Sequence, residues 1–120
     1  MLFNHILLVD DNAMIQRAHE RLVKTLTHQV SLAMSGAEAL TILSRQSADL
    51  IFMDMQMPDM DGLETTREIR RRGISTPIIA VTGNDSAENI TACRLAGMNG
   101  FIVKPMKLAL VQDEIDRLFH

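Results

Sequence analysis

Short apolar runs alternate with longer amphipathic stretches along the chain, and there are five of each. Because the runs are short and contain few polar residues, they are typical of strands buried on both faces of a parallel sheet. The predicted strands cover residues 6–9, 30–33, 50–53, 78–81 and 101–103.

The intervening stretches carry apolar residues at steps of three and four, which predicts amphipathic helices. The clearest sets are Ile15, Ala18, Leu22 and Leu26 in the first stretch and Leu108, Val111, Ile115 and Phe119 in the last. Helix starts are predicted by two capping boxes, Ser35 with Glu38 and Asp85 with Glu88, and helix ends by Gly73 and Gly97. The fourth helix is therefore expected over residues 85–96.

Strand and helix alternate five times, which predicts a three-layer α/β domain with right-handed crossovers. At this size the usual solution is a flavodoxin-like, doubly wound (βα)5 fold. It has a parallel sheet of strand order 2-1-3-4-5 and helices on both faces. The length of 120 residues suits a single domain over residues 1–120.

The amino-acid composition and the net charge limit the classes of function that the chain can have. Hydrophobic residues make up 47% and charged residues 22% of the chain, and the net charge of −3 gives no reason to expect nucleic-acid binding. The single cysteine, Cys93, excludes an internal disulfide and is expected to be a structural thiol. No apolar segment approaches the length of about 20 residues that a membrane span needs, so a cytoplasmic protein is expected. The basic run at residues 70–72 is expected to be a solvated helix end.

Polar residues stand at the ends of four predicted strands. Asp10 and Asp11 follow the first strand, Asp54 the third, Thr82 the fourth and Lys104 the fifth. In a sheet of this order, ligands bind beyond the carboxyl ends of the strands, where the strand order reverses. One shared pocket is therefore expected there.

The residue types in this pocket favour phosphoryl chemistry. Clustered carboxylates repel one another unless a cation compensates them, and Mg²⁺ is the hard cation that suits such oxygen ligands. Lys104 and Thr82 suit the oxygens of a phosphoryl group, and Asp54 is the candidate nucleophile. Asp10 alone could be a helix cap, and Thr82 and Lys104 alone could be ordinary strand and surface residues. Their joint placement favours a site.

Four segments, "ILLVDDN", "DLIFMDMQMPDMDG", "PIIAVTGN" and "GFIVKPM", closely resemble the receiver domain of two-component response regulators. The resemblance extends over essentially all 120 residues. It implies a (βα)5 fold in which one aspartate is reversibly phosphorylated by a histidine kinase or a histidine phosphotransfer protein.

The resemblance implies that Asp54 is the phosphoacceptor. It also implies that Mg²⁺ (or Mn²⁺) is bound directly by Asp11, through water by Asp10, and by the backbone carbonyl of Gln56. Gln56 and Asn84 occupy positions that flank the route of attacking water in the family.

The switch elements also follow from the resemblance. Thr82 is the switch hydroxyl, Lys104 pairs with the phosphoryl group, and the Lys104–Pro105 peptide is expected to be cis. Phe101 occupies the aromatic switch position, where the family often has tyrosine, so it cannot offer a hydroxyl to a partner. Output is expected on the surface of the fourth helix, fifth strand and fifth helix, including a phosphorylation-dependent dimer.

Two other functions stay open at this point. A binding module without phosphotransfer could use a calcium loop at residues 57–68, although Met57 lacks a ligand oxygen at the first position. A phosphatase would need an acid two residues after Asp54, where Gln56 stands. With the last helix expected to run to His120, the chain is either a stand-alone regulator or the receiver of a hybrid histidine kinase.

The acidic segment at residues 52–62 is expected to hold one reactive residue, Asp54. Asp59 and Asp61 are expected to shape the turn, with Gly62 supplying backbone freedom. Met55 and Met57 are expected to flank the pocket and control access to it. The histidines are expected to be surface or structural residues.

Overall fold

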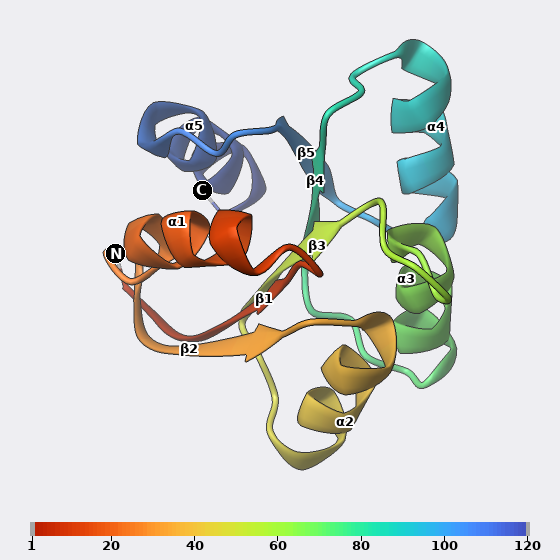
Figure 1. The fold of residues 1–120 in the computed structure, drawn as a ribbon, viewed down its shortest axis with the longest axis horizontal. Coiled ribbons are helices and arrows are strands. Elements are labelled where there is room, and N and C mark those ends of the chain that lie inside the picture. Colours follow the sequence, from red (N-terminus) through yellow and green to blue (C-terminus); the bar gives the residue numbers. More distant parts are fainter. Residues whose placement is uncertain (1, 120) are drawn as a thin grey trace.

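A computed structural model describes residues 2–119 and confirms the predicted fold class. Five parallel strands form one sheet of order β2-β1-β3-β4-β5, and helices cover both of its faces (Figure 1). The strands are β1 (Phe3–Val9), β2 (Thr27–Ala33), β3 (Leu50–Asp54), β4 (Ile78–Thr82) and β5 (Gly100–Val103). The helices are α1 (Ala13–Val23), α2 (Gly36–Arg45), α3 (Gly62–Arg71), α4 (Ala87–Ala96) and α5 (Leu108–Phe119).

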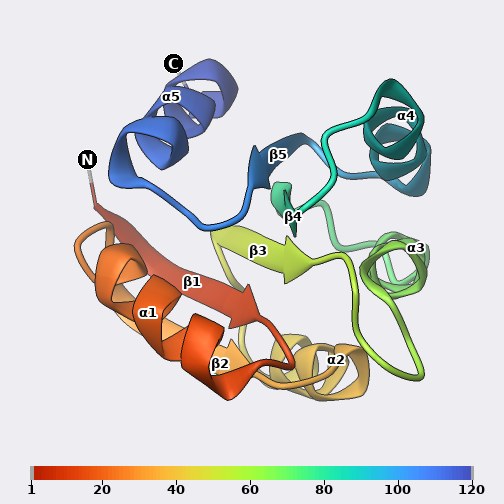
Figure 2. The same ribbon diagram turned by 45° about the horizontal axis from the view of Figure 1, so that its top comes forward.

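The sheet separates two hydrophobic clusters, because side chains alternate between its faces along each strand. In β3, Ile51 and Met53 face the cluster shared with α2, α3 and α4, whereas Leu50 and Phe52 face the cluster shared with α1 and α5. Figure 2 shows these two groups of helices on opposite sides of the sheet. The central strands are buried on both faces, which is why they appear in the sequence as uninterrupted apolar runs.

The helix starts are partly as predicted. Ser35 caps α2 by accepting a hydrogen bond from the Glu38 N–H, as the capping box predicts. The box at Asp85 is wrong: Ser86 caps α4 by accepting from the Asn89 N–H, and the helix begins at Ala87, two residues after its expected start. Both residues are good caps by type, so the sequence does not discriminate between them.

The buried side of α1 also differs from the prediction. Gln16, His19 and Val23 are buried, whereas Ala18 is exposed. The Gln16 amide donates to the Ala33 carbonyl oxygen at 2.9 Å, so its polar group is satisfied under the helix. A pattern of apolar residues cannot identify a buried face that contains glutamine and histidine.

Arg70 is not the solvated residue that its basic run suggests. It is half-buried, and its guanidinium donates to the carbonyl oxygens of Ile74, Thr76 and Gly97. Arg71 and Arg72 do lie in solvent and pair with Glu68. Arg70 therefore ties the end of α3 to the C-terminal end of α4.

The other structural predictions are largely confirmed. Cys93 is buried, and burial raises the pKa of its thiol, which suits a structural role. Gly73 and Gly97 both adopt positive φ at helix ends, and the Lys104–Pro105 peptide is cis. His5 and His19 are buried and His28 is exposed, while His120 lies outside the described residues.

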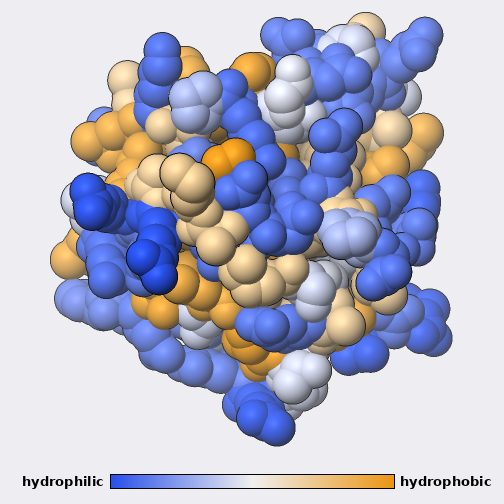
Figure 3. Space-filling model, viewed as in Figure 1, coloured by the Kyte–Doolittle hydropathy of each residue, from blue (hydrophilic) through white to orange (hydrophobic). Residues whose placement is uncertain are grey.

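The surface mixes residue types. Figure 3 shows hydrophilic residues over much of one face, with hydrophobic atoms between them. Within residues 2–119, every helix is too short or too polar to cross a membrane.

Candidate functional site

The register of the sheet brings the predicted site residues to one edge. Val9 pairs with Met53, so the residues that follow them, Asp10 and Asp54, emerge at the same level. Thr82 pairs with Val103, and the backbone N–H of Lys104 donates to the Thr82 carbonyl oxygen at 2.7 Å. Parallel pairing alone therefore aligns residues from four strand ends.

Three carboxylates converge at this edge. Asp10, Asp11 and Asp54 each offer one oxygen, and these oxygens all lie within 4.8 Å of one another. Asp10 and Asp54 are each 2% exposed, whereas Asp11 faces solvent. The Asn12 N–H donates to Asp10 Oδ1 at 2.9 Å, and Asn12 itself caps α1. Asp10 is therefore not needed as the helix cap.

Lys104 places its positive charge between two of these carboxylates. Its Nζ atom lies 2.8 Å from Asp54 Oδ1 and 3.6 Å from Asp10 Oδ2. Burial by itself would lower the pKa of Lys104, but hydrogen bonding and attraction from Asp54 and then Asp10 raise it above its ordinary value. One cation thus partly compensates two buried anions and stays charged.

The Asp54 carboxylate is only half satisfied. Oδ1 accepts from Lys104 and from the Gln56 N–H at 3.3 Å, but the buried Oδ2 has no hydrogen-bond partner among the described residues. Buried carboxylate oxygens without partners are unfavourable. An oxygen-seeking divalent cation would supply the missing partner, and the all-carboxylate donor set fits Mg²⁺.

The turn after β3 is shaped as predicted, apart from the role of Gly62. Asp61 caps α3 by accepting from the Glu64 N–H, and Asp59 holds a left-handed backbone with φ of 67°. Gly62 is not in that conformation. It is required because a Cβ atom there would collide with the Asp54 carbonyl oxygen. The start of α3 therefore packs directly on the backbone of Asp54.

The calcium-loop alternative is wrong. Glu68, its last expected ligand, lies near the end of α3 and is bonded to Arg71 and Arg72. Among residues 2–119, the one group of carboxylates, thiols or imidazoles close enough to hold a metal is the one at Asp10, Asp11 and Asp54.

Met55 and Met57 are not at the mouth of the pocket. They are 7% and 9% exposed and belong to the hydrophobic cluster beneath α2–α4. Their proposed control of access is therefore not supported. Gln56, between them, is exposed beside the site.

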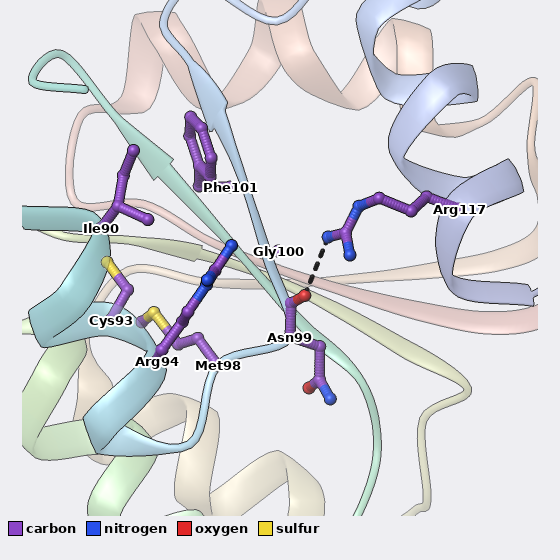
Figure 4. A pocket seen from close by; sticks show the side chains of 8 residues that line it. All are labelled: Ile90, Cys93, Arg94, Met98, Asn99, Gly100, Phe101 and Arg117. Atoms are coloured by element: carbon purple, nitrogen blue, oxygen red, sulfur yellow. Dashed lines mark hydrogen bonds between the residues drawn. The ribbon is translucent and has the colours of Figure 1, made fainter. Parts of the chain in front are cut away.

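Phe101 lies over a small groove between α4 and β5. Figure 4 shows its ring near Ile90, with Cys93 and Met98 deeper along the groove, and Arg117 donating to the Asn99 carbonyl oxygen on the other side. The ring is half-buried and packs against the α2–α4 cluster.

Two polar residues near the site were missed by the sequence analysis. Asn89, in the first turn of α4, donates its side-chain amide to Thr82 Oγ1 at 3.2 Å. His19 of α1 accepts from the Met106 N–H at 3.1 Å, just beyond Lys104. Neither has a sequence signal, because both contacts depend on how the helices pack.

The comparisons with known proteins agree with this geometry. The family model of the response regulator receiver domain matches residues 6–116, and the chain belongs to this family. It is 34% identical to the sensor histidine kinase RcsC of Escherichia coli K12 over 110 residues, which is 92% of this chain but 12% of RcsC. It is 37% identical to the two-component response regulator ARR22 of Arabidopsis thaliana, covering 96% of this chain and 83% of ARR22.

A solved structure is similar throughout. The receiver domain of the sensor histidine kinase PA1611 from Pseudomonas aeruginosa PAO1 has 38% identity and a TM-score of 0.83, with 95% of each chain covered. That structure contains a magnesium ion coordinated in its active site cleft. Receivers of histidine kinases and a separate response regulator are thus both similar to this chain.

Proposed function

We propose that residues 1–120 form one receiver domain that acts as a phosphorylation-dependent signalling switch. It accepts a phosphoryl group from phosphohistidine onto Asp54. The observation that carries this proposal is the state of the Asp54 carboxylate, which is buried and paired with Lys104 through one oxygen, while its other oxygen has no partner within residues 2–119. Two further carboxylates stand beside it.

The transfer exchanges one bond for another. An Asp54 oxygen attacks phosphorus and forms an O–P bond, while the N–P bond to the donor imidazole breaks and its electron pair returns to nitrogen. Lys104, already held 2.8 Å from Asp54 Oδ1, stabilises negative charge on the phosphoryl oxygens in the transition state.

The acidic group formed by Asp10, Asp11 and Asp54 is proposed to hold Mg²⁺, with Mn²⁺ as a substitute. Asp11 would bind it directly, Asp10 through water, and Asp54 and the Gln56 carbonyl would complete the protein ligands. When bound, the ion neutralises carboxylate repulsion and developing phosphoryl charge. The unpartnered Asp54 oxygen and the converging carboxylates support this assignment.

Thr82 and Phe101 are proposed to convert the chemistry into a change of surface. The Thr82 hydroxyl moves to the phosphoryl group, and the Phe101 ring turns into the groove below it. The altered face consists of α4, β5 and α5, and it is proposed to bind an effector or a second phosphorylated copy. Slow autodephosphorylation, tuned by Gln56 and Asn84, resets the switch.

The proposed partner is a histidine kinase or a histidine phosphotransfer protein, in line with the names of the relatives. No separate enzymatic activity toward free phosphoesters is proposed, because Gln56 stands where a phosphatase needs an acid. The net charge of −3 argues against nucleic-acid binding by this domain.

The proposal is tested by adding beryllofluoride, a mimic of the phosphoryl group, to the protein together with Mg²⁺. The chain has no tryptophan or tyrosine, so amide NMR spectra are the suitable measurement. We expect shifts around Asp54, Thr82 and Phe101 in the wild type and none in Asp54→Asn. The same response of the spectra to beryllofluoride in the two proteins would exclude the proposed switch.

A further inference from the structure

The hydroxyl of Thr82 is fully occupied in this structure. It donates to the Asn84 carbonyl oxygen at 3.2 Å and accepts from the Asn84 N–H at 3.0 Å. It also accepts from the Asn89 side-chain amide at 3.2 Å. A hydroxyl has one donor and two acceptor positions, so these three bonds use all of its capacity.

Asn89 closes this cluster from the helix side. Its amide nitrogen also donates to the Asn84 carbonyl oxygen at 2.6 Å, so that one side chain binds both the last residue of β4 and the β4–α4 loop. Asn89 is itself fixed at the start of α4, because its backbone N–H donates to the capping Ser86 hydroxyl. The cluster therefore joins the end of β4 directly to the first turn of α4.

We infer that Asn89 is a positioning residue that holds the Thr82 hydroxyl in the unphosphorylated arrangement. This inference rests on the proposed function, in which Thr82 moves toward a phosphoryl group on Asp54. Thr82 must then use its one O–H donor for the phosphoryl oxygen and release the Asn84 carbonyl. The Asn89 amide stabilises only the arrangement in which the Thr82 hydroxyl is bonded to the loop at Asn84, so it opposes the change.

The same contact links phosphorylation to α4. Arg70 donates to the Gly97 carbonyl oxygen and so holds the C-terminal end of this helix to α3. The buried residues of α4 are Cys93 and Ala96, which both lie in its C-terminal half. When Thr82 leaves, the first turn loses its bond to β4 and keeps its bond to Asn84 in the loop, while the far end stays held. The N-terminal turn is therefore the part of α4 whose contacts change.

The experiment compares beryllofluoride affinity at saturating Mg²⁺ in wild type, Asn89→Ala and Thr91→Ala. Thr91 is exposed on the same helix and serves as the matched control. We expect Asn89→Ala to bind about 3- to 10-fold more tightly, the effect of one or two lost net hydrogen bonds. Thr91→Ala should match the wild type.

A second comparison separates positioning from a general effect on the helix. In a Thr82→Ala background, adding Asn89→Ala should leave the affinity unchanged, because the hydroxyl that Asn89 holds is absent. In a Thr82→Ser background the increase should return. An equal increase in the Thr82→Ala background, or no increase in the wild-type background, would overturn the inference. If the wild type itself fails to bind beryllofluoride, the proposed function fails instead.

Discussion

The Lys104 ammonium lies 2.8 Å from Asp54 Oδ1, although Asp54 ends β3 and Lys104 follows β5, two strands that do not pair with each other. β4 separates them in the sheet, and the lysine reaches across its end. This ion pair is 2% exposed on the Asp54 side and 24% exposed on the Lys104 side, so solvent screens it only partly. The ion pair holds the Asp54 carboxylate in place at the edge of the sheet.

Replacing Lys104 should therefore slow phosphorylation. Lys104→Met retains the unbranched stem and removes the charge, so stabilisation of the transition state is lost. We expect the rate of labelling by acetyl phosphate to fall by about 100-fold, the scale of losing one preorganised electrostatic group. The matched control is Lys107→Met, at an exposed lysine three residues away. Equal rates in the two variants would contradict this role.

Metal binding should depend on the exposed aspartate of the acidic group. Asp11→Asn removes one charge at a position that does not contribute to the core. We expect the Mg²⁺ affinity, measured by calorimetry, to fall by about 10-fold or more, because the site loses charge and a hard oxygen ligand.

Asp59→Asn is the control for the metal experiment. Asp59 is exposed and has a left-handed backbone, which asparagine also tolerates well. Its Mg²⁺ affinity should equal that of the wild type. Loss of binding in Asp59→Asn but not in Asp11→Asn would place the metal elsewhere.

Gly62 should be intolerant of a side chain. Gly62→Ala brings a Cβ atom against the Asp54 carbonyl oxygen, so either α3 or the end of β3 must shift. We expect a loss of about 1–3 kcal/mol in the free energy of unfolding, measured by urea denaturation. Gly83→Ala is the control, because a Cβ atom there meets nothing within 4 Å. A smaller loss in Gly62→Ala than in Gly83→Ala would refute the close approach.

His19 should make stability depend on pH. Burial lowers the pKa of His19 below its ordinary value of 6.5, and attraction from Asp10 opposes this only in part. The unfolded chain therefore takes up a proton first as the pH falls. Stability from the neutral histidine is fully present above about pH 6.5 and is lost as the pH falls toward the lower folded pKa.

The variant His19→Gln tests this pH dependence. Glutamine does not titrate and keeps an acceptor oxygen for the Met106 N–H. We expect the unfolding free energy of His19→Gln to fall less steeply than that of the wild type between about pH 7 and about pH 5. The exposed His28→Gln should retain the wild-type slope. Equal slopes in all three proteins would exclude His19 as the titrating group.

Much of the fold could be predicted because parallel strands that are buried on both faces have short, continuous apolar sequences. The predicted runs in β1, β3 and β4 are apolar on both faces. A polar residue of the candidate site follows each run directly. Once the strand order is set, the register brings Asp10 and Asp54 to one level. Their proximity therefore follows from sheet geometry.

What could not be predicted depends on packing between elements. Arg70 looks like one of three surface arginines until the loops that supply its carbonyl partners are in place. His19 and Gln16 occupy the buried face of α1, where a periodicity of apolar residues points elsewhere. The link from Asn89 to Thr82 joins a helix to a strand end, and no spacing rule describes it.

Phosphoryl transfer to Asp54 is tested most directly by mapping the phosphorylated residue. The protein is incubated with acetyl phosphate and Mg²⁺, the acyl phosphate is trapped by borohydride reduction, and peptides are analysed by mass spectrometry. We expect one modified residue, Asp54, with none in Asp54→Asn and full modification in Asp59→Asn. An unmodified wild type, or equal modification of Asp54→Asn at another carboxylate, would contradict this expectation.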